Sequence, residues 1–569
     1  MLALTAQTTC ASLLALLTLT LNLPLLSAQP SLSVTSSTKD LGNGVHVPGA
    51  IPSNLYEPLQ HHLAFGKDYR TLYISWASFS FIRTPEVHFG TDPNNLNLTG
   101  TSHDSSTYPT SRTYNNHVKL MDLKPNTKYW YMVSYTNAAY AAYRPKYTFK
   151  TALPAGDLTP FSVAAFGDLG LMGPDGLSTR LGPLDTSTNT VLGANETNTI
   201  QSLLQSADSY DFIAHVGDIG YADYYLRAAT LGYFDNTPFL PTTEMIGVGY
   251  ESLKEQFFDQ MQPVTANKPW MVSPGTDFAY YELKMGGNHE ANCDNGGYSP
   301  KSGPGVNNYT DANCPVGQTN FTFYINQFRM PGPDSGGVGN FCECLSLGTA
   351  QKKHLNPTAQ LTPITFSCSG YSYNYGMAHF ISLDTETDLG HGLAGPIQNK
   401  SNNHNGPFGV TMNAQIDWLI SDLQRVDRKR TPWVVVFLHR PWYTAVGPPA
   451  TPPAWQIAFE GIFQQYNVDI YVQGHVHTYE RFSPRFNGIL DPNGYNNPSS
   501  PWPIIVGAAG HFDGLDTFTN AKTTQGWFGI DSLYGWSRLS FLDRQHMRLD
   551  YFASGNSSIV DSQTLFKQH

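Results

Sequence analysis

The sequence predicts a multi-domain α+β protein, in which a β-sandwich precedes an α/β domain whose sheets are flanked by helices. Residues 53–152 hold short strand-like runs separated by turn signals, with no convincing helix. Residues 158–495 instead alternate apolar strand-like runs with helical stretches, and several runs end abruptly in Gly-Asp, Asn-His or His. Such alternation is typical of an α/β sheet that carries its functional residues at strand ends.

The chain begins with a predicted signal peptide over residues 1–28. Its apolar run, 11–26, is followed by small residues, as in secretory signals. No Lys or Arg precedes the run and Leu26 is large for a cleavage site, so an N-terminal membrane anchor is the alternative. Pro24 favours cleavage, and residues 29–52 then form a Ser/Thr/Gly-rich lead-in. Because no later apolar stretch reaches about 18–20 residues, we expect a secreted, extracellular protein without a membrane partner.

Six Asn-x-Ser/Thr sequons agree with export, because occupied sequons lie on the surface of secreted proteins. The predicted glycosylation sites are Asn97, Asn195, Asn308, Asn320, Asn399 and Asn556.

Five cysteines follow the signal segment and lie in one region of the chain. They are Cys293, Cys314, Cys342, Cys344 and Cys368. An odd number leaves at least one unpaired or paired between chains. The Cys-Glu-Cys run favours disulfides or free thiols over zinc, because no second cysteine pair accompanies it.

The balance of charge argues against nucleic acid as a partner. The chain has 33 Lys and Arg against 44 Asp and Glu, a formal net charge of −11, and no long basic run. Any attraction for phosphate must therefore come from a local positive site, such as bound metal ions.

The sandwich is predicted from four strand-like runs and one turn. Its runs are residues 71–79, 85–91, 129–136 and 146–151. A turn at Pro125-Asn126 leads into a strand whose Tyr129 is placed to bond back to the turn backbone, as in the tyrosine corner of sandwich domains. The segment resembles fibronectin type III domains. We expect a spacer role for it, because it holds no cluster of metal-binding residue types.

The α/β domain is predicted from the runs that follow. Its strands are expected at residues 161–168, 212–218, 380–387, 433–439 and 468–475, and its helices at 198–207 and 413–426. Strand character returns at 503–510 and 546–554, so residues 496–569 are expected to complete this domain. Two long excursions, 224–262 and 291–345, carry little pattern.

Five short motifs follow predicted strands and carry metal-binding residue types. Carboxylates bring negative charge to a multivalent cation, neutral imidazoles suit first-row transition metals, and a phenolate favours Fe(III). Each motif alone is weak, but five of them at strand ends make coincidence improbable. The motifs are Gly167-Asp168-Leu169-Gly170, Gly217-Asp218-Ile219-Gly220-Tyr221, Gly287-Asn288-His289-Glu290, Leu438-His439-Arg440 and Gly474-His475-Val476-His477.

This set resembles the purple acid phosphatases, within the calcineurin-like metallophosphoesterases. That family's motifs run GDxG, GDxxY, GNH(E/D), VxxH and GHxH, and this chain reads GDLG, GDIGY, GNHE, VFLH and GHVH. The resemblance covers nearly everything after the signal, since larger plant and fungal members also carry a fibronectin-like N-terminal domain. The tyrosine of the second motif is the specific mark, because other metallophosphoesterases generally lack it.

The resemblance implies a centre of Fe(III) and one divalent metal, which is Zn, Mn or Fe. The implied Fe(III) ligands are Asp168, Asp218, Tyr221 and His477, with Asp218 bridging. The implied ligands of the divalent metal are Asn288, His439 and His475. Charge transfer from the tyrosinate to Fe(III) would make the protein purple.

The implied activity is that of a secreted acid phosphatase, in which a hydroxide between the metal ions attacks phosphate monoesters. The expected partners are small phosphorylated substrates, including inositol phosphates. His289 resembles the family's phosphate-contacting histidine and would stabilise the transition state or protonate the leaving group. Two alternatives are a phosphodiesterase or nucleotide pyrophosphatase on the same centre, and a non-catalytic secreted adhesion glycoprotein.

The sequence departs from the family in two places. Plant members place further histidines shortly after the VxxH ligand, whereas residues 443–449 contain none. His289 is therefore the candidate acid, and His511 a weaker one. Residues 276–287 also separate Pro274-Gly275 from Asn288, where the family runs straight on. This segment is either a genuine insertion or an error in the gene model.

Overall fold

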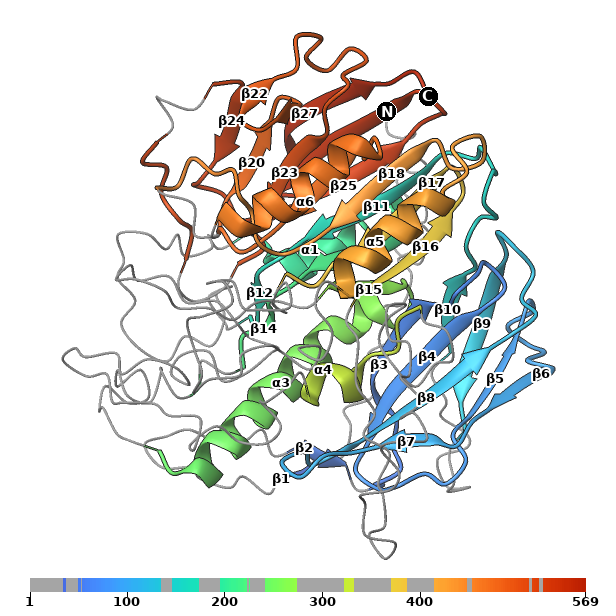
Figure 1. The fold of residues 1–569 in the computed structure, drawn as a ribbon. Helices are drawn as coiled ribbons and strands as arrows, with labels where there is room; N and C mark the ends of the chain where they lie inside the picture. Colours follow the sequence, from blue (N-terminus) through green and yellow to red (C-terminus); the bar gives the residue numbers. More distant parts are fainter. Residues whose placement is uncertain are drawn as a thin grey trace, which may run out of the picture.

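The fold is described from a computed structural model, drawn as a ribbon in Figure 1. The described residues are 34–36, 50–52, 54–134, 146–172, 195–222, 225, 241–273, 322–331, 370–385, 414–447, 453–510, 514–520 and 525–569. The predicted signal peptide lies outside them. No helix among these residues is long and apolar enough to span a membrane.

The first part of the chain is the predicted sandwich, built from two four-stranded antiparallel sheets. One sheet has the order β10-β9-β5-β6 and the other β3-β4-β8-β7. The strands are β3 (Leu59–Phe65), β4 (Leu72–Ser78), β5 (Glu86–Gly90), β6 (Leu98–Thr101), β7 (Asp104–Ser106), β8 (Tyr114–Leu120), β9 (Lys128–Val133) and β10 (Tyr147–Lys150). The four predicted strands are confirmed, and the described residues of this part hold no helix. A short pair, β1 (Val34–Ser36) and β2 (Ala50–Pro52), precedes the sandwich.

The predicted tyrosine corner is present at the start of β9. The Lys124 backbone N–H donates a hydrogen bond to the Tyr129 hydroxyl over 3.1 Å. Asn126 turns the chain at φ 47°, a left-handed conformation that asparagine tolerates well. Tyr129 is 3% exposed and stacks on Phe149 with ring centroids 5.2 Å apart. Tyr129 therefore joins the turn to the core of the sandwich.

The second part of the chain holds two mixed sheets that pack face to face. The six-stranded sheet has the order β15-β13-β11-β25-β26-β27, and the seven-stranded sheet β16-β17-β18-β19-β23-β20-β24. The first comprises β11 (Phe161–Phe166), β13 (Phe212–Val216), β15 (Trp270–Ser273), β25 (Gly535–Phe541), β26 (His546–Ala553) and β27 (Ser558–Phe566). The second comprises β16 (Tyr371–Tyr375), β17 (Ala378–Ser382), β18 (Trp433–Phe437), β19 (Ile470–Gln473), β20 (Tyr479–Phe482), β23 (Trp502–Val506) and β24 (Trp527–Ile530). The strands predicted in this part are confirmed.

Alternation along β18 explains how the layers form. Trp433, Val435 and Phe437 belong to the core between the two sheets. Val434 and Val436 face the opposite way, into a second core with helices α5 (Ala414–Arg425) and α6 (Pro453–Gln465). A strand buried on both faces therefore reads as an unbroken apolar run. Figure 1 shows α5 and α6 lying across this sheet.

Two short elements place the Gly-Asp turns together. β12 (Leu169–Gly170) pairs in parallel with β14 (Ile219–Gly220), immediately after β11 and β13. The remaining minor elements are α1 (Thr199–Gln205), the 3₁₀ turn η2 (Ala207–Ser209), α4 (Thr322–Gln327), and the hairpin of β21 (Arg485–Phe486) and β22 (Ile489–Leu490).

The prediction that residues 224–262 carry little pattern is wrong, because α3 spans Thr243–Thr265. Its N-cap is Thr242, whose hydroxyl accepts a hydrogen bond from the Met245 backbone N–H. Charged side chains are buried along this helix, so its inward face is not marked by apolar residues alone. In the second excursion, α4 is a further short helix that the sequence pattern did not reveal.

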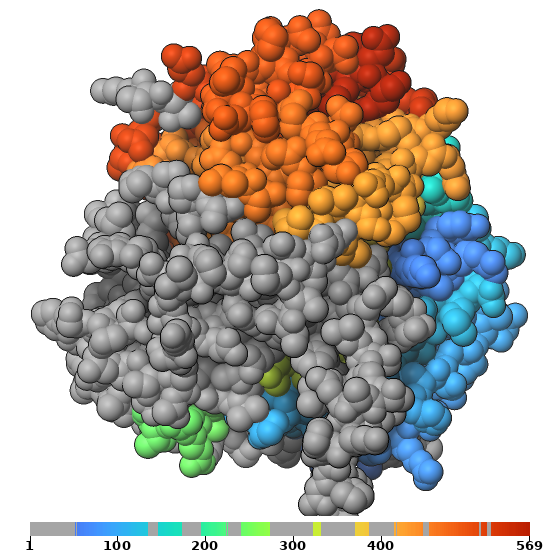
Figure 2. Space-filling view, viewed as in Figure 1, coloured from blue at the N-terminus to red at the C-terminus, as the bar shows by residue number. Residues whose placement is uncertain are grey.

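The C-terminal strands join the sheet that β11 begins. β25 pairs antiparallel with β11, and β26 and β27 extend the sheet. In the view of Figure 2, residues of the sandwich cover one side of the molecule and those after residue 414 cover the top. The domain boundaries given above stay predictions.

A buried carboxylate ties the chain's end to the second sheet. Asp469 precedes β19, is 1% exposed, and accepts hydrogen bonds of 2.7 Å from Arg428 and from the Val434 backbone N–H. The Lys567 ammonium lies 2.8 Å from its other oxygen. Burial alone would raise the pKa of Asp469, but Lys567 and Arg428 outweigh burial and hold that pKa below its ordinary value.

Asp469→Asn is expected to lower the free energy of unfolding by about 3 kcal/mol near pH 6, because two cations lose their anion. A lowered folded-state pKa contributes stability above the unfolded pKa of about 3.9, and that stability is lost as pH falls through the folded pKa. Urea denaturation at pH 6 and pH 3 should therefore show a smaller difference at pH 3. Asp122→Asn, at the exposed pair with Arg70, is the control and should change little. An equal loss at both pH values would contradict this account.

Candidate metal centre

The predicted metal ligands lie at one edge of the parallel strands. Asp168 follows β11, Asp218 follows β13, His439 follows β18 and His475 follows β19. Strands β11 and β13 run parallel, as do β18 and β19, so within each sheet the carboxyl ends meet at the same edge. Ligand sites are typical of this edge in open α/β sheets.

Four of the predicted metal ligands hold a left-handed backbone conformation that residues other than glycine rarely adopt. The φ angles are 61° at Asp168, 56° at Asp218, 52° at Tyr221 and 67° at His475. Such conformations cost about 1–3 kcal/mol each and persist only when the surroundings impose them. Their concentration in these loops marks a functional site rather than a set of ordinary turns.

Two glycines allow the backbone to approach the Asp168 carboxylate. A Cβ atom on Gly474 would lie 2.6 Å from Asp168 Oδ2 and 3.1 Å from His439 Nδ1. A Cβ atom on Gly507 would lie 2.1 Å from the Val476 carbonyl oxygen and 2.9 Å from Asp168 Oδ2. Neither position has room for a larger residue.

The first group of ligands surrounds the Tyr221 hydroxyl. This oxygen lies 3.1 Å from Asp168 Oδ1, 3.1 Å from Asp218 Oδ2 and 3.2 Å from His477 Nε2. His477 Nε2 is also 3.5 Å from Asp168 Oδ1. The structure therefore brings together the four residues that the resemblance assigns to Fe(III).

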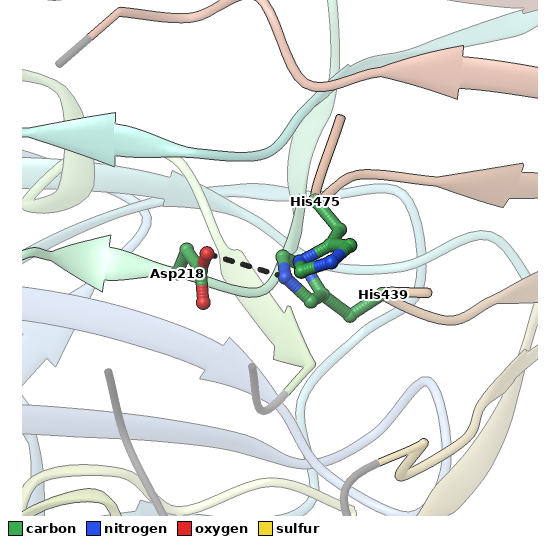
Figure 3. A group of neighbouring side chains, drawn as sticks. All are labelled: Asp218, His439 and His475. Carbon is green, nitrogen blue, oxygen red and sulfur yellow. Dashed lines mark ion pairs between the residues drawn. The ribbon is translucent and has the colours of Figure 1, made fainter. Parts of the chain in front are cut away.

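The second group comprises Asp218, His439 and His475 (Figure 3). One candidate ligand atom from each lies within 4.8 Å of the other two, and His439 Nε2 is 3.2 Å from Asp218 Oδ2. Asp218 belongs to both groups, which is the position of a bridging ligand. The Nδ1 atom of His475 is buried and has no hydrogen-bond partner among the described residues.

Main-chain hydrogen bonds orient the imidazoles. His439 Nδ1 lies 2.7 Å from the Val216 carbonyl oxygen, so Nδ1 carries the proton and Nε2 is left to act as a ligand. The His475 backbone N–H donates to both oxygens of Asp168, at 3.0 and 2.8 Å. Asp168 of the first motif therefore fixes the backbone of the fifth motif at His475.

The pKa shifts agree with a site that needs cations. Burial and the neighbouring Asp218 raise the pKa of Asp168, against the lowering effect of His439 and His477. Burial, with Arg440 and His439 nearby, lowers the pKa of His475 well below its usual range, so the ring is neutral. Neutral imidazoles and buried carboxylates are the donor set that transition metals take. The residues present therefore fit a metal centre.

Two further residues support the site and were not predicted from the sequence. Asp516 accepts a hydrogen bond from the His477 backbone N–H over 2.8 Å, and its own N–H donates to the His477 carbonyl over 3.1 Å. His215 lies 3.3 Å from the Asp218 carbonyl oxygen, and burial lowers its pKa to about 3. No local pattern marks Asp516, whereas His215 stands inside the second strand-end run.

Several predicted residues lie outside the described part of the chain. They are the ligand Asn288, the candidate acids His289 and His511, the segment 276–287, the five cysteines, and Asn308, Asn320 and Asn399. The other three sequons, at Asn97, Asn195 and Asn556, are exposed, as glycosylation requires.

Three family models match the chain and together cover most of it. Purple acid Phosphatase, N-terminal domain, matches residues 58–151. Calcineurin-like phosphoesterase matches residues 161–479, and Iron/zinc purple acid phosphatase-like protein C matches residues 500–562. The three matches follow the order of the sandwich, the α/β part and the C-terminal strands.

Curated relatives and solved structures agree with these matches. Acid phosphatase A of Cryphonectria parasitica is 34% identical over 91% of this chain and 94% of its own length. Acid phosphatase of Aspergillus ficuum is 28% identical over 86% of this chain and 83% of its own. The structure of a purple acid phosphatase from yellow lupin seeds matches 91% of this chain and 76% of its own, with TM-score 0.59 and 20% identity, a likeness of fold.

Gly507→Ala is expected to empty the site of metal, because the new methyl group would collide with the Val476 carbonyl between His475 and His477. Metal affinity should fall about 100-fold, as measured by elemental analysis after dialysis. Gly461→Ala is the matched control: it lies in α6 with nothing within 4 Å of the added Cβ. That change should raise stability by about 0.5–1 kcal/mol and leave the metal content unchanged. Equal metal contents in the two variants would contradict the steric argument.

Proposed function

Because this chain belongs to the purple acid phosphatase family of calcineurin-like phosphoesterases, we propose that it hydrolyses phosphate monoesters at a centre of Fe(III) and one divalent metal. The family uses a binuclear metal centre, and two of its relatives here are named acid phosphatases. The divalent ion is Zn, Mn or Fe. What is proposed beyond the family is the identity of the metals, the ligand set and the substrates.

One observation supports a binuclear centre above the others. The Asp218 carboxylate is shared by a group with Asp168, Tyr221 and His477 and by a group with His439 and His475. The first of these groups is rich in oxygen and contains a phenol, whereas the second contains two imidazoles. Two sites of different chemistry that share one carboxylate suit two different ions.

We assign the ligands accordingly. Fe(III) would be held by Asp168, Asp218, Tyr221 and His477, and the divalent ion by Asp218, Asn288, His439 and His475. Asn288 enters this assignment from its motif alone. Tyr221 is 1% exposed beside two carboxylates, a setting in which its phenolate would need a strongly charged cation nearby.

The reaction is hydrolysis with water as nucleophile. When bound, the two ions supply an acidified water and neutralise the charge of the phosphate group. The chain's own part is to hold that centre rigidly: Asp168 fixes the His475 backbone, Val216 fixes the His439 tautomer, and Asp516 fixes His477. We propose His289 as the group that contacts phosphate and protonates the leaving alkoxide.

We also propose that the protein is secreted and glycosylated, and that inositol phosphates are among its substrates. The apolar leader and the exposed sequons Asn97, Asn195 and Asn556 support secretion. The extension to inositol phosphates rests on the resemblance of the motifs.

One preparation tests the main proposal. Purified full-length protein should contain two metal ions per chain including iron, absorb visible light, and hydrolyse para-nitrophenyl phosphate between pH 4 and 7. Inositol hexakisphosphate and bis-para-nitrophenyl phosphate, assayed in parallel, separate monoesterase, phytase and diesterase activities. A colourless protein that retains metal but lacks activity would overturn the proposal.

Tyr221→Phe is expected to abolish the visible band, because the proposed band is charge transfer from the Tyr221 phenolate to Fe(III). Tyr225→Phe is the matched control: this tyrosine lies four residues further on, is also 1% exposed, and belongs to neither ligand group. Absorbance spectra of the two variants, at equal iron content, decide the matter. A band that survives in Tyr221→Phe would remove Tyr221 from the centre.

A further inference from the structure

Helix α3 lies between the sandwich and the two Gly-Asp turns of the candidate centre (Figure 1). We propose that α3 fixes the position of the first group of ligands, the one around the Tyr221 hydroxyl, relative to the sandwich. Glu251 is the positioning residue where α3 meets the sandwich. This inference rests on the proposed function and gives the sandwich a role in it.

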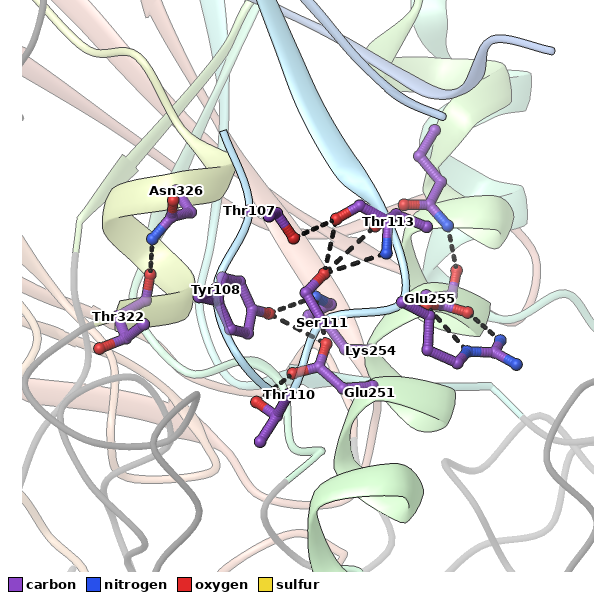
Figure 4. Close-up of polar contacts among 12 residues, drawn as sticks. Thr107, Tyr108, Thr110, Ser111, Thr113, Glu251, Lys254, Glu255, Thr322 and Asn326 are labelled. Atoms are coloured by element: carbon purple, nitrogen blue, oxygen red, sulfur yellow. Dashed lines mark hydrogen bonds and ion pairs between the residues drawn. The ribbon is translucent and has the colours of Figure 1, made fainter. Parts of the chain in front are cut away.

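The sandwich side of the contact is a buried ionic network centred on Glu251 (Figure 4). The Tyr108 hydroxyl donates to Glu251 Oε2 over 2.9 Å, and the Thr110 hydroxyl donates to Oε1 over 3.1 Å. The Lys254 ammonium lies 2.6 Å from Glu251 Oε2. Glu251 is 0% exposed and Lys254 is 2% exposed, so this ion pair, whose two residues both belong to α3, is buried where the sandwich bonds to it.

The sandwich contacts α3 at further points along the helix. Arg112 pairs with Glu255, one helical turn after Glu251. Near the end of α3, the Thr265 hydroxyl donates to the His61 carbonyl over 2.8 Å, and the His61 N–H donates to Gln262 over 3.2 Å. From Glu251 to Thr265 these contacts extend over about 21 Å of helix, at about 1.5 Å per residue.

The other side of α3 holds the loop of the first motif. The Gln260 side chain accepts a hydrogen bond from the Met172 backbone N–H over 2.9 Å. The same amide donates to the Met172 carbonyl over 2.6 Å. Met172 stands four residues after Asp168, so one side-chain amide fixes both backbone groups at the end of this turn.

The helix also packs against the second motif. A Cβ atom on Gly220, which precedes Tyr221, would lie 3.2 Å from the Phe257 ring. At Gly249 a Cβ atom would lie 2.4 Å from the Tyr225 ring, so the helix backbone contacts that ring directly. Helix α3 therefore touches the chain on both sides of Tyr221.

Buried charges that bond across two elements set the register between them in a way that apolar packing does not. Apolar surfaces tolerate small sliding movements, whereas a buried charge separated from its partner is strongly unfavourable. Sliding α3 along the sandwich would separate Glu251 from the Tyr108 and Thr110 hydroxyls. It would also separate Glu255 from Arg112, so these contacts together permit one axial position of α3. That position places Gln260 opposite Met172 and Phe257 beneath Gly220.

The test compares Glu251→Gln with a variant at another contact of the sandwich. Asp104→Asn is the control, because Asp104 forms a two-bond ion pair with Arg329, at 2.8 and 2.9 Å, and Arg329 follows α4 rather than belonging to α3. Tyr108→Phe is a milder second variant that keeps every charge in place. Each is made in the full-length chain and studied at the same interval below its own melting temperature.

Glu251→Gln should shift the visible band and speed the loss of iron to a chelator at least tenfold, and Tyr108→Phe should act in the same direction. Asp104→Asn should lower the melting temperature without either effect. Equal rates of iron loss in all three variants would show that the network stabilises the fold in general without positioning the metal site, and would overturn the inference. An unshifted band in Glu251→Gln would also overturn it. Should Glu251→Gln not fold, Tyr108→Phe decides by the same measures.

Amide hydrogen exchange in the metal-free protein separates this inference from the proposed function. Glu251→Gln should raise exchange at residues 168–172 and 217–222, whereas Asp104→Asn should not. This readout needs no bound metal, so it stands even if the wild-type protein proves colourless. Unchanged exchange at both turns would overturn the inference while leaving the proposed phosphatase untouched.

Discussion

The burial of two carboxylates side by side is the constraint on which the rest of the catalytic part depends. Asp168 and Asp218 are 0% and 1% exposed, at the ends of neighbouring parallel strands. Ionised carboxylates so placed are strongly unfavourable unless positive groups and hydrogen-bond donors surround them. Here the imidazoles of His439 and His477 and the backbone N–H of His475 do so in part. The left-handed turns and the closely packed glycines bring these groups close to the two carboxylates. The backbone strain in the loops therefore accompanies the stabilisation of the charge at the centre.

The strand-end motifs were predictable because local sequence and topology point the same way. An apolar run that stops at Gly-Asp or at His places that residue at the carboxyl edge of a buried strand, and parallel pairing then gathers such residues. The corner at Tyr129 was predictable for a similar reason, since its partner, Lys124, stands five residues away. Helix α3 could not be predicted from apolar spacing, because Glu251, Lys254 and Glu255 are buried on it. Asp516 could not be predicted either, since it holds His477 by main-chain bonds from 39 residues away.

The sandwich was expected to be a spacer, and the polar character of its contact with α3 argues against so passive a role. Contacts between domains of one chain are usually wet and permit relative motion. The contact at Glu251 and Lys254 is instead buried and charged, and the Tyr108 hydroxyl within it is kept protonated, because burial raises its pKa well above the ordinary value. Movement of the sandwich would separate the Tyr108 and Thr110 hydroxyls from Glu251. The burial of this pair therefore favours a sandwich that is fixed to the catalytic part.

The scaffold and the centre stabilise buried carboxylates by different means. In the scaffold, Asp550 contacts Arg538 and Arg548 at 2.8 and 2.6 Å, and Asp469 contacts Arg428 and Lys567. Burial would raise both pKa values, but the Ser562 hydroxyl with the two arginines at Asp550, and the cations at Asp469, lower them below their ordinary values. At Asp168 burial raises the pKa, and the groups that oppose burial are the imidazoles of His439 and His477 rather than permanent cations. Asp469 and Asp550 therefore need no metal ion to stay charged in acid, whereas the charge of Asp168 in acid depends on what is bound beside it.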